Sequence, residues 1–302
     1  MTSRSARLAR FIGWLGSNVD GVIALAIALV VAVLGALDVL GSSAVNSAIL
    51  LTLAVLATTL LRDRHLAMVN RSDASAVRAL TGRDTSEALE IARRHTDQWT
   101  FKGGTGTYLR AVTLPRCIEN ARADGRSLRV QIEILDPADE RTCTAYTQFR
   151  RSLSTAPDRT GEEWTFVRTR NEALATILAA SWYLQRHYFL IIDLGLSTAI
   201  STLRWDLSSN CLILTQEDPS TPALIFEKAN PYYHSYHREL VSSFERARRV
   251  AVDRDAGLSN EPSTSEVRDL FDRLEINLQN GLDDADLADV IRRAIHPRNP
   301  YW

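Results

Sequence analysis

The chain has 302 residues, of which 45% are hydrophobic and 24% are charged, and its formal net charge is -1. This length allows one large domain or two smaller ones with a substantial core. The near-neutral charge argues against a protein that coats DNA or binds membranes through a basic surface. The cysteines form no CxxC pair and no ligand spacing with histidine, so neither a disulfide framework nor a zinc ribbon is expected.

Two apolar stretches near the N-terminus predict a transmembrane hairpin within residues 1–67. They cover residues 22–40, interrupted only by Asp38, and residues 44–61, which carry no charge. Either stretch is long enough to cross a hydrocarbon core of about 30 Å. Arginines precede the first stretch and follow the second, so both termini are expected in the cytoplasm of a bacterial inner-membrane protein. A cleaved signal peptide is the alternative for the first stretch.

The rest of the chain predicts a mixed α/β fold, with a central sheet flanked by helices. Residues 68–256 are expected to form a cytosolic sensor-like domain, and residues 257–302 a C-terminal helical pair that begins with a Ser263/Glu266 capping box. The expected helices cover residues 72–96 (with a break at Gly82), 108–123, 140–153, 162–186 and 231–252, with a last helix starting at Asp283. The expected strands cover residues 127–135, 188–194, 201–207, 211–216 and 223–227.

The strongest local signal is the glycine-rich run Lys102-Gly103-Gly104-Thr105-Gly106-Thr107, which ends just before a predicted helix. Glycines let backbone N–H groups converge, and a helix N-terminus offers partial positive charge to an anion. Lys102 and Arg110 add side-chain charge on either side. The run has no GK[ST] spacing and is not a P-loop. It indicates either contact with a phosphate or nucleotide, or a plain structural loop.

Three charged residues in predicted strands are further candidates for ligand binding. Strand alternation puts Arg204 and Asp206 on one face, directed either to solvent or into a cleft. Their alternative role is a simple surface ion pair. Asp193 lies in an apolar run, where a buried carboxylate needs a partner, or at a strand end, where ligands gather.

No catalytic, cofactor or metal motif emerges. His234 and His237 lie on one predicted helix without HExxH or a third ligand, and His187 has no GxSxG nucleophile motif in the chain. We therefore expect no resident metal or cofactor, and a protein that is not an enzyme.

Three segments carry a resemblance: WTFKGGTGTYLRAVTLP at 99–115, VQIEILDP at 130–137, and the part of 203–224 that reads LRWDLSSN and LTQEDPSTPAL. They resemble bacterial proteins with a degenerate phospholipase-D-like domain, which lack the HxKxxxxD motif, as does this chain. Two short spans before a cytosolic domain also resemble the layout of membrane effectors in anti-phage defence. The resemblance implies a domain that senses a nucleotide or nucleic-acid signal.

The expected function is ligand sensing by the cytosolic domain, with homo-oligomeric spans that alter the permeability of the lipid bilayer. Two alternatives stay open. One is a membrane-tethered phosphodiesterase-like enzyme that uses Asp193, His187 or Asp206. The other is a membrane scaffold that recruits a protein partner through C-terminal helices at about 263–295.

Overall fold

The computed structural model describes residues 77–153, 162–218, 220–278 and 281–300, together with Leu53, Ala57 and Leu60. Ser75–Trp302 form one compact unit. Nowhere in these described parts does a helix have both the length and the apolar character needed to cross a bilayer. This finding contradicts the predicted inner-membrane location and gives no support to the lipid bilayer as a partner. The two expected spans themselves fall outside the described residues, apart from Leu53, Ala57 and Leu60.

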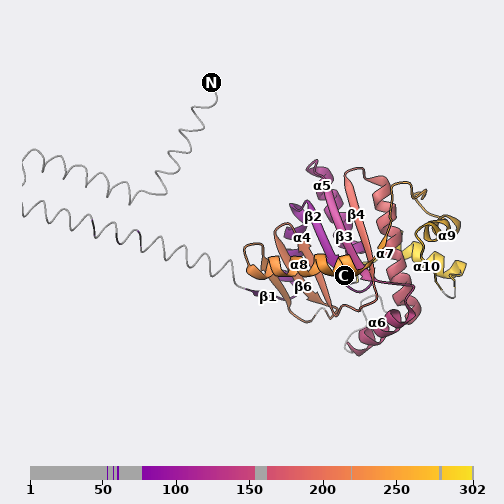
Figure 1. Cartoon of the computed structure of the whole chain (residues 1–302), viewed down its shortest axis with the longest axis horizontal. Coiled ribbons are helices and arrows are strands. Elements are labelled where there is room, and N and C mark those ends of the chain that lie inside the picture. Colours follow the sequence, from indigo (N-terminus) through magenta and orange to yellow (C-terminus); the bar gives the residue numbers. More distant parts are fainter. Residues whose placement is uncertain are drawn as a thin grey trace, which may run out of the picture. The chain divides into compact units, whose positions relative to one another are not determined.

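A mixed sheet forms the centre of this unit, and among the described residues it has eight strands in the order β1-β7-β6-β5-β2-β3-β4-β8 (Figure 1). Strands β2, β3 and β4 run parallel to one another, and every other neighbouring pair is antiparallel. The strands are β1 Arg78–Leu80, β2 Gln98–Lys102, β3 Leu128–Leu135, β4 Leu190–Ser197, β5 Leu203–Ser208, β6 Cys211–Gln216, β7 Ala223–Glu227 and β8 Arg248–Val250.

Five of the described helices begin where a capping side chain satisfies one or two of their first N–H groups. Backbone N–H groups two or three residues further along the chain donate hydrogen bonds to the side chains of Asp139, Thr165, Asn230 and Asp283. Ser263 forms the predicted capping box with Glu266. The helical segments are α4 Arg83–Arg94, the π-helix η1 Leu109–Thr113, α5 Leu114–Ala123, α6 Glu140–Ser152, α7 Phe166–Arg186, α8 Pro231–Arg246, α9 Thr264–Arg273 and α10 Asp284–Ile295.

The sheet has apolar side chains on both faces. The larger core contains Trp99 and Ile132 from the sheet and Leu178 from α7, all at most 1% exposed. On the other face α8 lies across the sheet (Figure 1), and its Leu240 packs in a smaller cluster with Leu207 and other strand residues. Burial of each side chain of this size contributes about 1.5–3 kcal/mol to the free energy of unfolding. The two cores therefore hold helices in place on both faces of the sheet.

Three short strands of the sheet are missing from the sequence-based prediction. The helix expected over residues 72–96 does break at Gly82, and α4 begins at Arg83, but residues 78–80 before the break form a strand that pairs with β7. Residues 98–102, for which the sequence predicts no element, form β2. The helix expected over 231–252 ends at Arg246, because residues 248–250 pair with the edge of β4. Strands this short have too few residues for a clear period-2 pattern.

The C-terminal helices belong to this compact unit. Helix α10 packs on α7, where Arg170 pairs with Asp286 at 2.7 Å and Asn171 donates to Asp289 at 3.1 Å. One side of α10, the second of the two predicted docking helices, is therefore occupied by the chain's own α7.

Candidate functional site

The glycine-rich run forms the loop between β2 and η1, at the carboxyl end of β2. The Gly103 N–H donates to the Glu133 carbonyl at 3.1 Å, and the Leu135 N–H donates to the Gly104 carbonyl at 2.9 Å, so the first two glycines continue the pairing with β3. A side chain at Gly104 would overlap the ring of Tyr146. Gly106 has a φ of 75°, which favours glycine.

Arg110 lies beneath this loop, in a buried network around Glu172 of α7. Its guanidinium pairs with the Glu172 carboxylate and donates to Thr176 Oγ1 at 2.7 Å. Thr107 donates to the same carboxylate at 3.0 Å, and Arg293 of α10 reaches its other oxygen at 2.6 Å. Burial alone would raise the pKa of Glu172, but the attraction of Arg110 and Arg293 outweighs it and lowers that pKa. Arg110 therefore anchors the loop.

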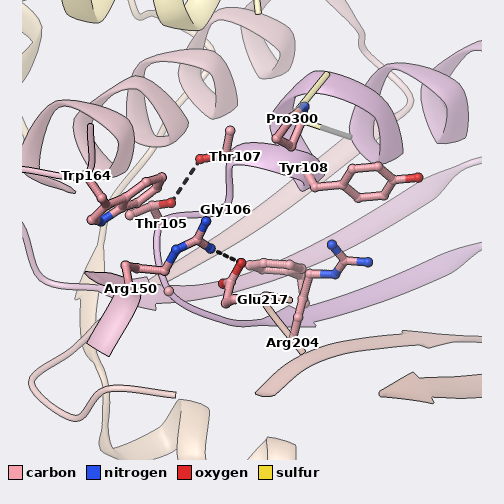
Figure 2. A pocket seen from close by; sticks show the side chains of 11 residues that line it. Thr105, Gly106, Thr107, Tyr108, Arg150, Trp164, Arg204, Glu217 and Pro300 are labelled. Carbon is pink, nitrogen blue, oxygen red and sulfur yellow. Dashed lines mark hydrogen bonds and ion pairs between the residues drawn. The ribbon is translucent and has the colours of Figure 1, made fainter. Parts of the chain in front are cut away.

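A small pocket opens between this loop and the neighbouring side chains (Figure 2). Its volume is about 30 Å³, which is room for one or two water molecules. It is lined by loop residues 104–108 together with Phe101, Arg150, Trp164, Arg204, Glu217 and Pro300. The sequence-predicted residues that meet here are Gly104, Gly106 and Arg204.

Arg204 lines the pocket, and its guanidinium group is held in place by contacts with neighbouring side chains. Its Nε donates to Asp206 at 2.8 Å, and the Trp99 indole N–H donates to the same carboxylate at 3.2 Å. The guanidinium lies over the Tyr108 ring, 4.5 Å from its centroid. The predicted alternation is confirmed: Arg204 and Asp206 share a sheet face, and they form a pair with both side chains at most 7% exposed.

Arg150 of α6 and Glu217, just beyond β6, also line the pocket, where the Glu217 carboxylate points toward Arg150 (Figure 2). Their side chains pair, and the Tyr146 hydroxyl donates to Glu217 at 2.8 Å. The Trp164 ring lies between the guanidinium groups of Arg150 and Arg168, at 4.1 and 4.2 Å from its centroid. Sequence reasoning missed these residues because nothing in their local pattern sets them apart.

Lys102, Gly103 and Asp193 do not line the pocket. Lys102 belongs to the α8 face of the sheet, where its Nζ lies 3.2 Å from Glu133 and bonds to Ser243 of α8. Asp193 pairs with Arg129 at 2.8 Å on the neighbouring parallel strand.

The residues of the phosphodiesterase alternative have separate partners. His187 lies 2.8 Å from Arg122, whose charge adds to burial in lowering the histidine pKa, whereas Asp193 pairs with Arg129 and Asp206 with Arg204. Within the parts of the chain that the structure describes, no three His, Cys, Asp or Glu side chains gather as a metal site would require.

No protein-family model matches the chain, and no curated protein matches it in sequence. A solved structure of TrmBL2, described as an archaeal chromatin protein with a novel mode of DNA binding, is 10% identical over 66% of this chain and 65% of that chain. Its TM-score of 0.32 is too low to support an argument about function. The resemblance to phospholipase-D-like membrane effectors is contradicted, because no family model supports it and the described residues hold no membrane-spanning helix.

Proposed function

We propose that the α/β domain senses a ligand by binding its phosphate group, as in a nucleotide, in the pocket between the glycine loop, Arg150 and Arg204. The observation that carries this proposal is the convergence of a glycine loop with two guanidinium groups from other parts of the chain. Guanidinium groups suit phosphate because their planar donors match its oxygens.

The position of the pocket in the sheet supports the same function. It lies at the carboxyl end of β2, beside the parallel strand β3, which is where ligands bind in many α/β proteins. A helical segment starts directly after the loop, with the Arg110 N–H donating to the Gly106 carbonyl at 2.9 Å. Its N-terminal end adds partial positive charge on the side where the phosphate would lie.

The size of the pocket links binding to a change in conformation. A volume of about 30 Å³ does not hold a phosphate group, so some of the lining side chains must move when a ligand enters. Arg150, Trp164, Glu217 and Pro300 are the lining residues that come from outside the loop and the central strands. A ligand that displaces them changes contacts of α6 and of the segment after α10, which is how binding becomes a signal.

Calorimetric titration of the purified full-length chain with inorganic phosphate, AMP and ATP tests this function. We expect at least one of the three to bind, and Arg150→Ala to weaken binding about tenfold or more, since a hydrogen bond to a charged group contributes about 1.5–3 kcal/mol.

The matched control is Arg151→Ala. Arg151 is the next residue on α6, where it forms an exposed pair with Glu163 at 2.6 Å. The proposed function is wrong if none of the three probes binds, or if Arg150→Ala and Arg151→Ala have the same effect.

A further inference from the structure

We infer that Glu217 is an internal anion, which holds Arg150 until the phosphate of a ligand displaces it, and that this exchange makes the pocket selective for dianionic phosphate over carboxylate. The inference rests on the proposed function and adds its ligand class and regulation.

Glu217 already occupies the place that an anionic ligand would take. It lies one residue beyond the end of β6, lines the pocket and pairs with Arg150, and both side chains are at most 14% exposed. The Tyr146 hydroxyl donates a second hydrogen bond to the carboxylate, at 2.8 Å. Arg150 thus has an anionic partner from within the chain, and a ligand competes with that partner.

The charges around the pocket cancel while Glu217 remains. Arg150 faces Glu217 and Arg204 faces Asp206, so two guanidinium groups meet two carboxylates. An anion that entered without displacing either carboxylate would approach a like charge in a partly desolvated space, which is unfavourable. Asp206 is 1% exposed and accepts a second hydrogen bond, from Trp99, whereas Glu217 is partly exposed. Glu217 is therefore the carboxylate that leaves.

The displaced side chain can reach solvent from its position in the chain. Glu217 begins the turn between β6 and β7, and its neighbour Gln216 is exposed, as is Ser220 within the turn. Rotation of the Glu217 side chain moves its carboxylate out of the pocket without breaking a strand pair, because the β6 pairing ends at Gln216.

Ligand selectivity follows from what replaces the carboxylate. When a ligand carboxylate replaces Glu217, Arg150 exchanges one singly charged partner for another, so little binding free energy is gained. A phosphate monoester brings close to two negative charges and three acceptor oxygens, enough for hydrogen bonds to both Arg150 and Arg204. The pocket therefore favours a terminal phosphate over a carboxylate.

The experiment compares Glu217→Gln with the wild type in the full-length chain. Glutamine keeps the shape of the side chain and an acceptor for Tyr146 but removes the charge. The probes are inorganic phosphate and acetate at about pH 8, where phosphate carries close to two negative charges and acetate carries one. The matched control is Glu163→Gln, which neutralises the exposed partner of Arg151.

We expect Glu217→Gln to bind phosphate about tenfold more tightly than the wild type, to bind acetate measurably, and thus to lose selectivity, while Glu163→Gln matches the wild type. Should Glu217→Gln unfold, Tyr146→Phe, which removes one hydrogen bond from Glu217, is expected to raise phosphate affinity a few-fold. If the wild type binds phosphate and Glu217→Gln binds it equally well or more weakly, the inference is wrong, while the proposed function still holds. Absence of phosphate binding in every variant would overturn this inference, and a failure with AMP and ATP as well would overturn the proposed function.

Discussion

The substitution Glu172→Gln is expected to destabilise the α/β unit more than any comparable change on its surface. The Glu172 side chain is 4% exposed and pairs with Arg110, which is 2% exposed. Without the carboxylate charge, Arg110 keeps hydrogen bonds to the Glu172 carbonyl at 2.8 Å and to Thr176 at 2.7 Å but has lost its ion-pair partner. Arg293 is less affected by the loss of this charge, because it keeps a second ion pair with Asp289 at 2.7 Å.

The size of this effect follows from the burial of the pair. Removing one member of a buried ion pair costs about 3–5 kcal/mol, because the other charge stays desolvated. In a unit of this size a loss of 1 kcal/mol lowers the Tm by about 2–4 °C, so we expect a fall of roughly 6–20 °C.

Differential scanning calorimetry of the full-length variant at about pH 7 measures this fall. Glu163→Gln is the control, since its carboxylate is 68% exposed, and surface changes of this kind remain within about 0.5 kcal/mol. Arg293→Met should lower the free energy of unfolding less than Glu172→Gln does, because the Glu172 carboxylate then keeps its ion pair with Arg110. A loss below about 1 kcal/mol for Glu172→Gln, or a larger loss for Arg293→Met, would refute the reasoning.

Three further predictions concern the same unit. The folded-state pKa of Glu172 lies below its ordinary value of about 4.3. The stabilisation that this carboxylate gives the fold is therefore complete above that value and is lost as the pH falls through the folded-state pKa. Acid titration of Glu172→Gln should show a shallower loss of stability than that of the wild type. Gly104→Ala should lower the Tm by several degrees in a thermal melt, because its methyl group overlaps Tyr146, and an unchanged Tm would contradict that packing. Burial raises the thiol pKa values to about 11 or 12, so iodoacetamide at neutral pH should label the native chain far more slowly than the urea-unfolded chain; rapid native labelling would contradict the burial of Cys117, Cys143 and Cys211.

Much of the fold was predictable where the local pattern is strong. The strands at 211–216 and 223–227 match the expected bounds, and the capping residues Ser263 and Asp283 start α9 and α10 as their sequence indicates. The three-residue strands β1 and β8 could not be found, because their conformation depends on pairing with β7 and β4 rather than on their own sequence.

The candidate site was predictable only in part. Alternation in β5 correctly put Arg204 and Asp206 on one face, and the glycine spacing identified the loop. The partner of Arg110 lies 62 residues away, so its role as a buried anchor could not be inferred locally. Arg150 and Glu217 are 67 residues apart and meet only when α6 and the end of β6 lie at the same pocket.

The two outermost strands of the sheet have a consequence for solubility. Both β1 and β8 have three residues, and each carries arginine: Arg78 on one side, Arg248 and Arg249 on the other. Strands this short and this charged offer few unpaired main-chain groups to an incoming molecule. Among the described residues, both edges of the sheet are therefore poorly suited to pairing with a strand of another copy.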